Sequence, residues 1–156
     1  MVELYRFTVD EPNYSRLLRE EVDLEQFDNL PDVLESSQSA RIWAIKPGSE
    51  GVYDQLNPGD YLLFYLGAKY RVQDEGFYDA MGQVDEKFQG SMVSASALFH
   101  NPEAVRMLTV KNFERISKTP KDIRRILGYE RHPQGPHRVR KEHYSSISRV
   151  VEELRS

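Results

Sequence analysis

Three short β-type segments separated by turn signals lie between residues 40 and 84, and they constrain the fold more than any other feature of the sequence. The segments read ARIWAIK (40–46), GDYLLFYLG (59–67) and GFYDAMGQV (76–84), and turn signals lie at Lys46-Pro47-Gly48, at Asn57-Pro58-Gly59-Asp60 and around Asp74-Glu75-Gly76. Short runs rich in aromatic and β-branched residues, bounded by Gly, Pro, Asn and Asp, are typical of strands. The sequence therefore predicts a compact sheet.

Two segments after the sheet carry signals for further elements. A strand is predicted over 104–110, and a helix should follow it, with Thr119 as its N-cap, Pro120 at its first position and Gly128 at its end. Near the C-terminus, apolar residues recur at spacings of three and four, which predicts a helix with one apolar stripe docked on the sheet: Tyr144, Ile147, Val151 and Leu154.

The N-terminal residues 1–39 are mostly polar, and apolar positions with helical spacing between residues 13 and 22 predict a peripheral helical cap. A chain of 156 residues fits one domain with its own hydrophobic core. The predicted fold is therefore a single α+β domain over residues 1–156. It consists of the helical cap (1–39), a small, mixed, barrel-like β-sheet (40–117) and basic C-terminal helices that wrap it (118–156).

The net charge of −4 conceals a strong asymmetry along the chain. Residues 1–103 carry 8 Lys and Arg against 19 Asp and Glu, a net charge of −11, whereas residues 104–149 carry 12 against 4, a net charge of +8. A basic segment on an acidic protein indicates a surface that faces a polyanion. From charge alone, an ordinary solvated surface is an equal alternative.

Several common enzyme classes leave no trace in the sequence. It contains no cysteine, no glycine-rich phosphate loop, no Gly-x-Ser-x-Gly elbow and no His-Glu-x-x-His helix. We therefore expect a non-catalytic protein without cofactor or metal, and a soluble, cytoplasmic one, because the apolar runs are far shorter than the roughly 20 residues of a membrane span. A nuclease or hydrolase that uses His132 or His137, in the basic region, remains the enzymatic alternative.

Aromatic residues are the more informative side chains, because 11% of the chain is Phe, Trp or Tyr. Most of them must build the core. Those beside turn residues, among them Tyr53, Phe77 and Phe99, are better placed to line a pocket, since a flipped nucleic-acid base is held by stacking between rings and by hydrogen bonds to its polar edge.

The residues from 40 to 84, which include IWAIKPGS, GVYDQL and GFYDAMG, resemble the YTH and EVE branches of the PUA-like superfamily of modified-base readers. The resemblance extends through LFHNPEAVRMLTVKNF and ILGYERHPQGPHRV to about residue 140. That region is similar to the N-terminal specificity domains of archaeal McrBC-type and HNH-type modification-dependent restriction enzymes. In those enzymes the reader flips a methylated base out of duplex DNA, and a separate motor or nuclease domain or subunit cuts.

The resemblance implies roles for individual residues. Tyr53 and Phe99 match the two cage walls, with Phe77 as a third aromatic candidate, whereas Trp43 matches a core position of a strand. The residues implied to contact the base edge or the backbone are Lys46, Ser49 and Asp54. The cages of YTH domains use tryptophan at both walls, and this chain has smaller aromatics there.

Binding to the phosphates is assigned to the basic segment, through Arg124, Arg125, Arg131, Arg138, Arg140 and Lys141. The predicted partner is double-stranded DNA that carries a methylated base, with N6-methyladenine favoured by the YTH-like elements and 5-methylcytosine next. A reader of N6-methyladenosine in single-stranded RNA is the alternative within the same fold.

Overall fold

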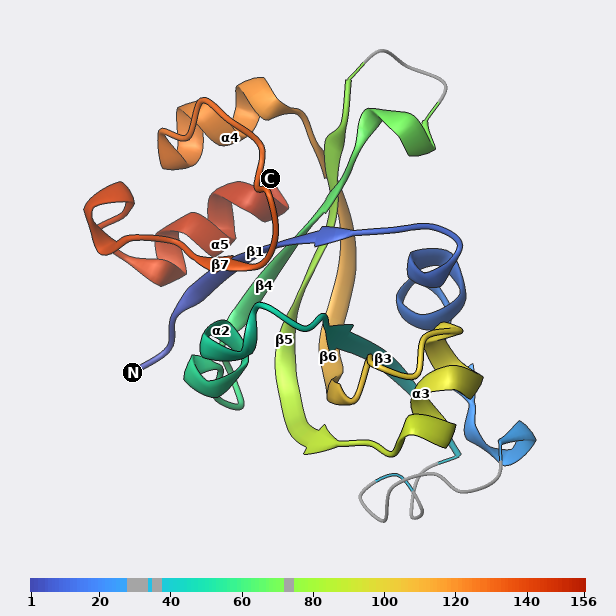
Figure 1. Ribbon diagram of the computed structural model, residues 1–156. Helices are drawn as coiled ribbons and strands as arrows, with labels where there is room; N and C mark the ends of the chain where they lie inside the picture. Colours follow the sequence, from blue (N-terminus) through green and yellow to red (C-terminus); the bar gives the residue numbers. More distant parts are fainter. Residues whose placement is uncertain (28–33, 35–37, 72–74) are drawn as a thin grey trace. The chain divides into compact units, whose positions relative to one another are not determined.

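A computed structural model describes residues 1–27, 34, 38–71 and 75–156 of the chain (Figure 1). These residues contain one seven-stranded sheet with the strand order β2-β3-β6-β5-β4-β1-β7. The strands are β1 (Leu4–Val9), β2 (Val22–Asp23), β3 (Ser39–Ile45), β4 (Tyr61–Leu66), β5 (Phe77–Gln89), β6 (Arg106–Lys118) and β7 (His137–Arg138). Strand β1 runs parallel to β4, whereas β3 and β6, and likewise β4 and β5, are antiparallel.

The described helices are α2 (Glu50–Gln55), α3 (Met92–Phe99), α4 (Pro120–Leu127) and α5 (Ile147–Arg155). The described residues also contain four short helical turns: η1 (Ser15–Arg19), η2 (Leu24–Gln26), η3 (Ala68–Tyr70) and η4 (Lys141–His143). No helix in the described part of the chain is both long and apolar enough to cross a membrane. The mixture of sheet and helices is the α+β class that the sequence predicts.

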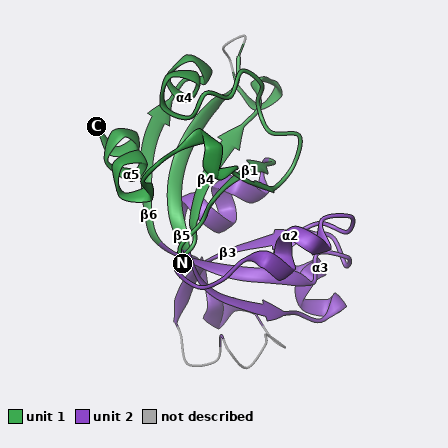
Figure 2. Cartoon of the chain, turned by 90° about the vertical axis from the view of Figure 1, so that its left-hand side faces the viewer, with its two compact units in different colours: residues 1–10, 60–83, 112–156 green, residues 11–59, 84–111 purple. Residues whose placement is uncertain are grey.

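The chain divides into two compact units, each built from separate stretches of sequence (Figure 2). Unit 1 comprises Met1–Asp10, Asp60–Gln83 and Asn112–Ser156, and unit 2 comprises Glu11–Gly59 and Val84–Lys111. The long strands β5 and β6 each pass through both units.

The core of unit 1 lies between its strands and the two C-terminal helices (Figure 1). Leu63 of β4 and Met81 of β5 pack in one cluster with Ile123 of α4 and with Val151 and Leu154 of α5. The apolar stripe predicted for the last segment is therefore confirmed, since Tyr144 and Ile147 also pack against this cluster.

The boundaries of α4 follow from the chemistry of its ends. The Thr119 hydroxyl accepts a hydrogen bond from the Asp122 N–H at 3.1 Å, and the Thr119 N–H donates to the Asp122 carboxylate at 3.0 Å, which makes a capping box. These hydrogen bonds lower the pKa of Asp122. Gly128 ends the helix with a φ of +77°, a left-handed conformation that glycine adopts without strain. The sequence prediction of this helix is confirmed at both ends.

The N-terminal residues differ from the helical cap that the sequence predicts. Leu4–Val9 form a buried strand that pairs with β4 from Leu4↔Tyr61 to Val9↔Leu66. The run LYRFTV is rich in apolar and aromatic residues, as a buried strand requires, but it is short and mostly polar residues follow it. Among the described residues of this region, helical structure is limited to residues 13–19, which include η1, to the turn η2 and to Leu34.

Unit 2 has its own core around strand β3. Trp43 pairs with Leu108 of β6, is 5% exposed, and meets Phe99 of α3 edge-to-face with ring centroids 6.0 Å apart. Leu17 and Leu18 of η1 are buried in the same unit. The assignment of Trp43 to the core is confirmed.

Candidate nucleic-acid interface

Four of the residues assigned to the base site lie on one continuous segment of unit 2, from the end of β3 through α2. Lys46 follows β3 and begins a turn in which Gly48 has a φ of +100° and the Ser49 N–H donates to the Lys46 carbonyl at 3.3 Å. The Ser49 carbonyl then accepts from the N–H of Tyr53 at 3.2 Å as α2 begins. Lys46 and Asp54 are exposed, so this segment presents a cation, a carboxylate and an aromatic ring within nine residues.

Tyr53 is held rigidly from two sides. Its hydroxyl lies 2.9 Å from the carbonyl oxygen of Phe88 on β5 and 3.0 Å from that of Met107 on β6, so the single O–H donates between two acceptors. The Lys87 ammonium lies 4.9 Å from the centre of the ring and donates to the Tyr53 carbonyl at 2.7 Å. Burial raises the pKa of Tyr53. The ring therefore has a fixed orientation, as an aromatic wall requires.

The other two proposed walls lie elsewhere. Phe99 ends α3 and is 6% exposed, with its ring packed on Trp43, so the walls Tyr53 and Phe99 share unit 2 but are held by different neighbours. Phe77 begins β5 in unit 1, where the Arg71 guanidinium lies 3.7 Å from the centre of its ring. Phe77 belongs to the other compact unit, so a shared cage with Tyr53 and Phe99 stays a prediction.

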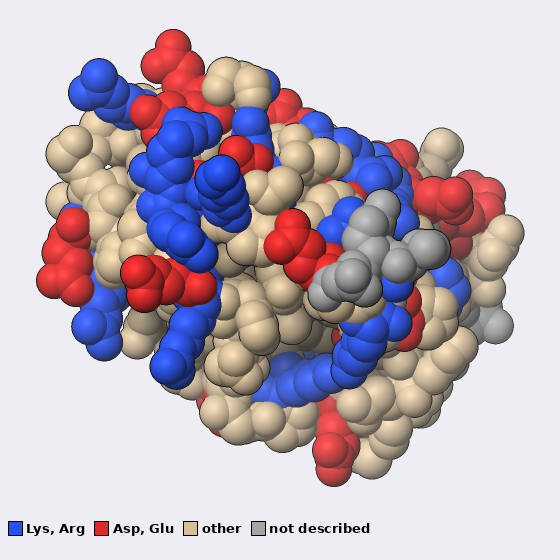
Figure 3. Space-filling view, turned by 90° about the horizontal axis from the view of Figure 1, so that it is seen from above, with Lys and Arg blue, Asp and Glu red and all other residues tan. Residues whose placement is uncertain are grey.

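All six cations assigned to phosphate binding belong to unit 1 and are exposed: Arg124, Arg125, Arg131, Arg138, Arg140 and Lys141. Arg140 approaches Glu142 at 3.8 Å and Lys141 approaches Glu3 at 3.4 Å. Within the described part of the chain, the other four side chains form no ion pair. Figure 3 shows many Lys and Arg side chains on the left of the view, the side on which α4 lies in Figure 1, with a few acidic residues among them.

A buried arginine that the sequence reasoning missed anchors the basic loop of unit 1. Arg6 of β1 is only 3% exposed. Its Nε donates to His137 Nε2 at 2.8 Å, and one Nη donates to the Tyr78 hydroxyl at 2.8 Å and to the Arg131 carbonyl at 3.0 Å. Its guanidinium also lies 3.9 Å from the centre of the Tyr129 ring. The sequence signal for this residue was a single charge inside the otherwise apolar run LYRFTV. If such a run is buried, its charged residue must have partners, because charged residues are seldom buried without them.

These contacts determine the chemistry of His137. Because Nε2 accepts a hydrogen bond from Arg6, the imidazole is neutral and carries its proton on Nδ1, which faces the Arg138 carbonyl at 3.2 Å. Burial and the charge of Arg6 lower the pKa of His137. Its lone pair is thus already used inside the protein, which argues against His137 as a general base.

Two other histidines of the basic region stack on tyrosines. The exposed ring of His132 lies parallel to Tyr65, with 5.3 Å between centroids and 6° between planes. His143 stacks on Tyr129 at 4.0 Å, and its Nδ1 lies 2.6 Å from the Leu127 carbonyl. Among the described residues, no three His, Cys, Asp or Glu side chains are grouped so as to hold a metal ion.

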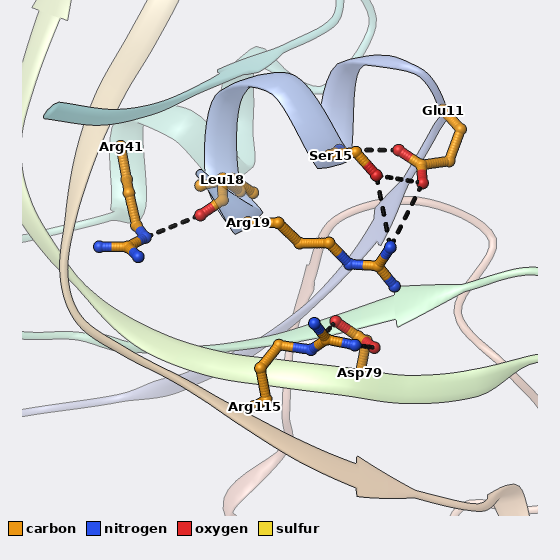
Figure 4. Close-up of polar contacts among 7 residues, drawn as sticks. All are labelled: Glu11, Ser15, Leu18, Arg19, Arg41, Asp79 and Arg115. Carbon is orange, nitrogen blue, oxygen red and sulfur yellow. Dashed lines mark hydrogen bonds and ion pairs between the residues drawn. The ribbon is translucent and has the colours of Figure 1, made fainter. Parts of the chain in front are cut away.

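Further polar contacts strengthen each unit by itself, and Figure 4 shows how they are made. In unit 1, the fully buried carboxylate of Asp79 on β5 receives two contacts from Arg115 of β6, at 2.7 and 2.8 Å. In unit 2, Ser15 donates to the Glu11 carboxylate through both its N–H and its hydroxyl, at 2.7 and 2.6 Å. The Arg41 Nε donates to the Leu18 carbonyl at 2.7 Å, which ties β3 to η1.

No protein-family model and no curated protein matches the sequence. Among solved structures, the chain is similar to the N-terminal domain of Thermococcus gammatolerans McrB bound to m5C DNA, with a TM-score of 0.73 and 18% identity. That similarity covers 97% of this chain and 98% of the McrB domain. The chain is also similar to a mutant ASCH protein of Zymomonas mobilis, with a TM-score of 0.53, 8% identity, and coverage of 96% and 97%. The PUA-like α+β fold predicted from the sequence is thereby confirmed.

Proposed function

We propose that this chain is a reader domain that binds methylated duplex DNA and holds the methylated base flipped out of the helix. The observation that carries the proposal is the fold, which matches over nearly the whole chain a domain whose structure contains m5C DNA. The exposed cations of unit 1 and the rigid aromatic segment of unit 2 supply the two kinds of contact such a reader needs.

Affinity comes from the cations of unit 1 in this proposal. Six phosphate contacts would release condensed counterions, and the logarithm of the binding constant should fall with the logarithm of salt concentration with a slope of about −5. Arg124, Arg125, Arg131 and Arg138 can bind phosphate without breaking an ion pair, since they form none within the described residues. This term is independent of sequence and of methylation.

Selectivity comes from the segment from β3 through α2. Tyr53 provides an immobile ring for the base to stack on, and the side chains of Lys46, Ser49 and Asp54 read its polar edge. Burial of one methyl group contributes about 0.8 kcal/mol, or roughly a fourfold preference, so the polar contacts must supply the rest of the discrimination. Phe99 and Phe77 remain candidates for a second wall, each within its own unit.

The proposal includes no chemical step by this chain. The lone pair of His137 is occupied by Arg6, and the ring of His132 is stacked on Tyr65. Cleavage would therefore reside in a separate motor or nuclease domain or subunit, to which this reader supplies the specificity.

A binding panel tests the function. Fluorescence anisotropy would compare otherwise identical duplexes with 5-methylcytosine, N6-methyladenine, N4-methylcytosine or no methyl group, and a single-stranded RNA with N6-methyladenosine. The YTH-like sequence elements favour N6-methyladenine, and the similar McrB structure carries m5C, so these two duplexes are the critical ones. We expect at least tenfold tighter binding to one methylated duplex than to the unmethylated one. Equal affinities for all duplexes, or a preference for the RNA, would overturn the proposal.

A further inference from the structure

Two adjacent apolar side chains project from unit 2 into solvent. Met92 and Val93, at the start of α3, are 66% and 61% exposed. Among the described residues, the other exposed large hydrophobic side chains are Met1 and Val2 at the chain terminus. Two neighbouring apolar side chains exposed on one helix form a small apolar patch, and exposed apolar patches are where partners commonly bind.

The backbone that carries this pair is rigid. The Ser91 hydroxyl accepts from the Ser94 N–H at 3.0 Å, and the Ser91 N–H donates to the Ser94 hydroxyl at 2.9 Å, which closes a capping box around Met92 and Val93. Immediately before it, the Gly90 N–H donates to the Val105 carbonyl at 2.7 Å. A Cβ on Gly90 would lie 2.7 Å from the terminal methyl of Met107 and 2.8 Å from the Ser94 hydroxyl, so a larger residue would have to displace these side chains. The apolar tip is therefore a fixed projection.

The stretch of sequence that contains the tip carries no formal charge. Residues 88–102 contain no Asp, Glu, Lys or Arg. The rest of unit 2 is acidic, since the unit has 7 Lys and Arg against 13 Asp and Glu, a net charge of −6. A neutral tip with small neighbours can approach a polyanion closely, whereas the acidic surface elsewhere on the unit would be repelled.

The tip also lies close to the proposed base site. The Tyr53 hydroxyl is held by the carbonyls of Phe88 and Met107, and the same two residues flank the tip. Met92 follows Phe88 by four residues, which span at most about 14 Å, and Met107 contacts Gly90. This reach is comparable to the roughly 12 Å width of the major groove. One bound duplex can thus touch both features.

We propose that Met92 and Val93 are a wedge that enters the base stack and fills the place left by the flipped base. The inference rests on the proposed function. Flipping leaves an apolar gap between the neighbouring base pairs, and Met is among the side chains that DNA-bending proteins insert between base steps. The side chains of Met92 and Val93 become buried between base pairs only when the base is flipped out of the helix. Their burial therefore stabilises the flipped state.

The experiment uses a duplex with the preferred methylated base and 2-aminopurine as its neighbour, because 2-aminopurine fluorescence rises when stacking is lost. The wild-type chain should produce this rise. The double variant Met92→Ala with Val93→Ala should reduce the rise at least fivefold and weaken duplex binding about tenfold. Its affinity should return to within twofold of wild type on a duplex with an abasic site opposite the methylated base, where flipping is already easy. Ser96→Ala, an exposed change on the same helix, is the matched control.

The outcomes separate the wedge from the reader function. If the double variant flips and binds like wild type, the wedge is wrong and the reader proposal stands. Equal loss of binding on the normal and abasic duplexes also refutes the wedge, because the pair then contributes general affinity only. A change in oligomeric state with unchanged DNA binding would assign the pair to a protein contact instead. A wild-type chain without methyl preference would refute the proposed function and the wedge together. Circular dichroism and the unfolding temperature verify that each variant is folded.

Discussion

Replacement of Arg6 by Met should destabilise unit 1 and release its basic loop. The change keeps a long, unbranched side chain but removes the guanidinium that donates to His137, Tyr78 and the Arg131 carbonyl. The last of these acceptors belongs to the loop between α4 and β7, which carries Arg131, one of the proposed phosphate contacts. The remaining anchors are the Thr8 hydroxyl, which donates to the Pro133 carbonyl at 3.0 Å, and the pairing of β7 with β1.

The size of the effect follows from the contacts. Hydrogen bonds from a charged donor contribute about 1.5 kcal/mol each at the low end of their range, so three of them amount to about 4.5 kcal/mol. Part of this loss of stability, about 1–2 kcal/mol, is offset because the variant no longer buries a charge and because Met buries additional apolar surface. We therefore expect the free energy of unfolding to fall by about 3 kcal/mol, which lowers the melting temperature of a chain of this length by roughly 6–12 °C.

Urea titration followed by circular dichroism measures the loss of stability, and anisotropy at a temperature below the transition measures DNA affinity. Arg124→Met is the matched control, because Arg124 is exposed and forms no ion pair within the described chain. Its stability should stay within about 0.5 kcal/mol of wild type while its DNA affinity falls. An Arg6→Met protein less than 1 kcal/mol below wild type would show that Arg6 does not anchor the loop.

Four further outcomes are expected. The pKa of His137 is lowered in the folded chain, so the unfolded chain binds more protons below about pH 6.5. The stability of the fold should therefore decrease as the pH drops below that value. Melting curves between pH 7.5 and 4.5 should show a smaller decrease for His137→Gln than for wild type. Tyr53→Ala should abolish the methyl preference in the binding panel and keep weak non-specific binding. Tyr53→Phe keeps the ring and should retain the preference, with a loss of about 1–2 kcal/mol of stability. An unchanged preference in Tyr53→Ala would exclude the ring from the site. Joint replacement of Arg124 and Arg125 by Ala should reduce the magnitude of the salt slope by about 2 for every duplex, methylated or not, and a constant slope would remove these residues from the interface. Thr119→Ala should cost about 1 kcal/mol in urea titration through loss of the α4 cap, and no loss would contradict the capping box.

The predictable parts of the fold were those encoded over short stretches of sequence. Thr119, Pro120 and Gly128 marked α4 because caps depend on the few residues at each helix end. The three β-type runs between residues 40 and 84 became β3, β4 and the first half of β5 for the same reason. Strand β1 was missed because the parallel partner that buries it, β4, begins 57 positions later in the sequence at the first pair, Leu4↔Tyr61.

For the candidate site, the sequence grouped the side chains of the proposed surfaces but did not identify the residues that hold them in place. Lys46, Ser49, Tyr53 and Asp54 could be grouped because they are neighbours in the chain, and the cations of residues 124–141 could be grouped by their charge. The carbonyls that orient Tyr53 come from Phe88 and Met107, and no local pattern connects these positions. The same holds for Arg6 and His137, which are separated by 131 positions.

The sequence by itself determined the helix ends, most of the strands, the charge asymmetry and the absence of thiol chemistry, since each of these depends on residue type and near neighbours. The tertiary structure alone decided that a charged residue of β1 is buried, that His137 is held neutral as a hydrogen-bond acceptor, and that Met92 and Val93 are exposed on a capped helix. Burial and hydrogen-bond partnership are properties of residues brought together from distant parts of the chain, so they emerge only when the strands have paired.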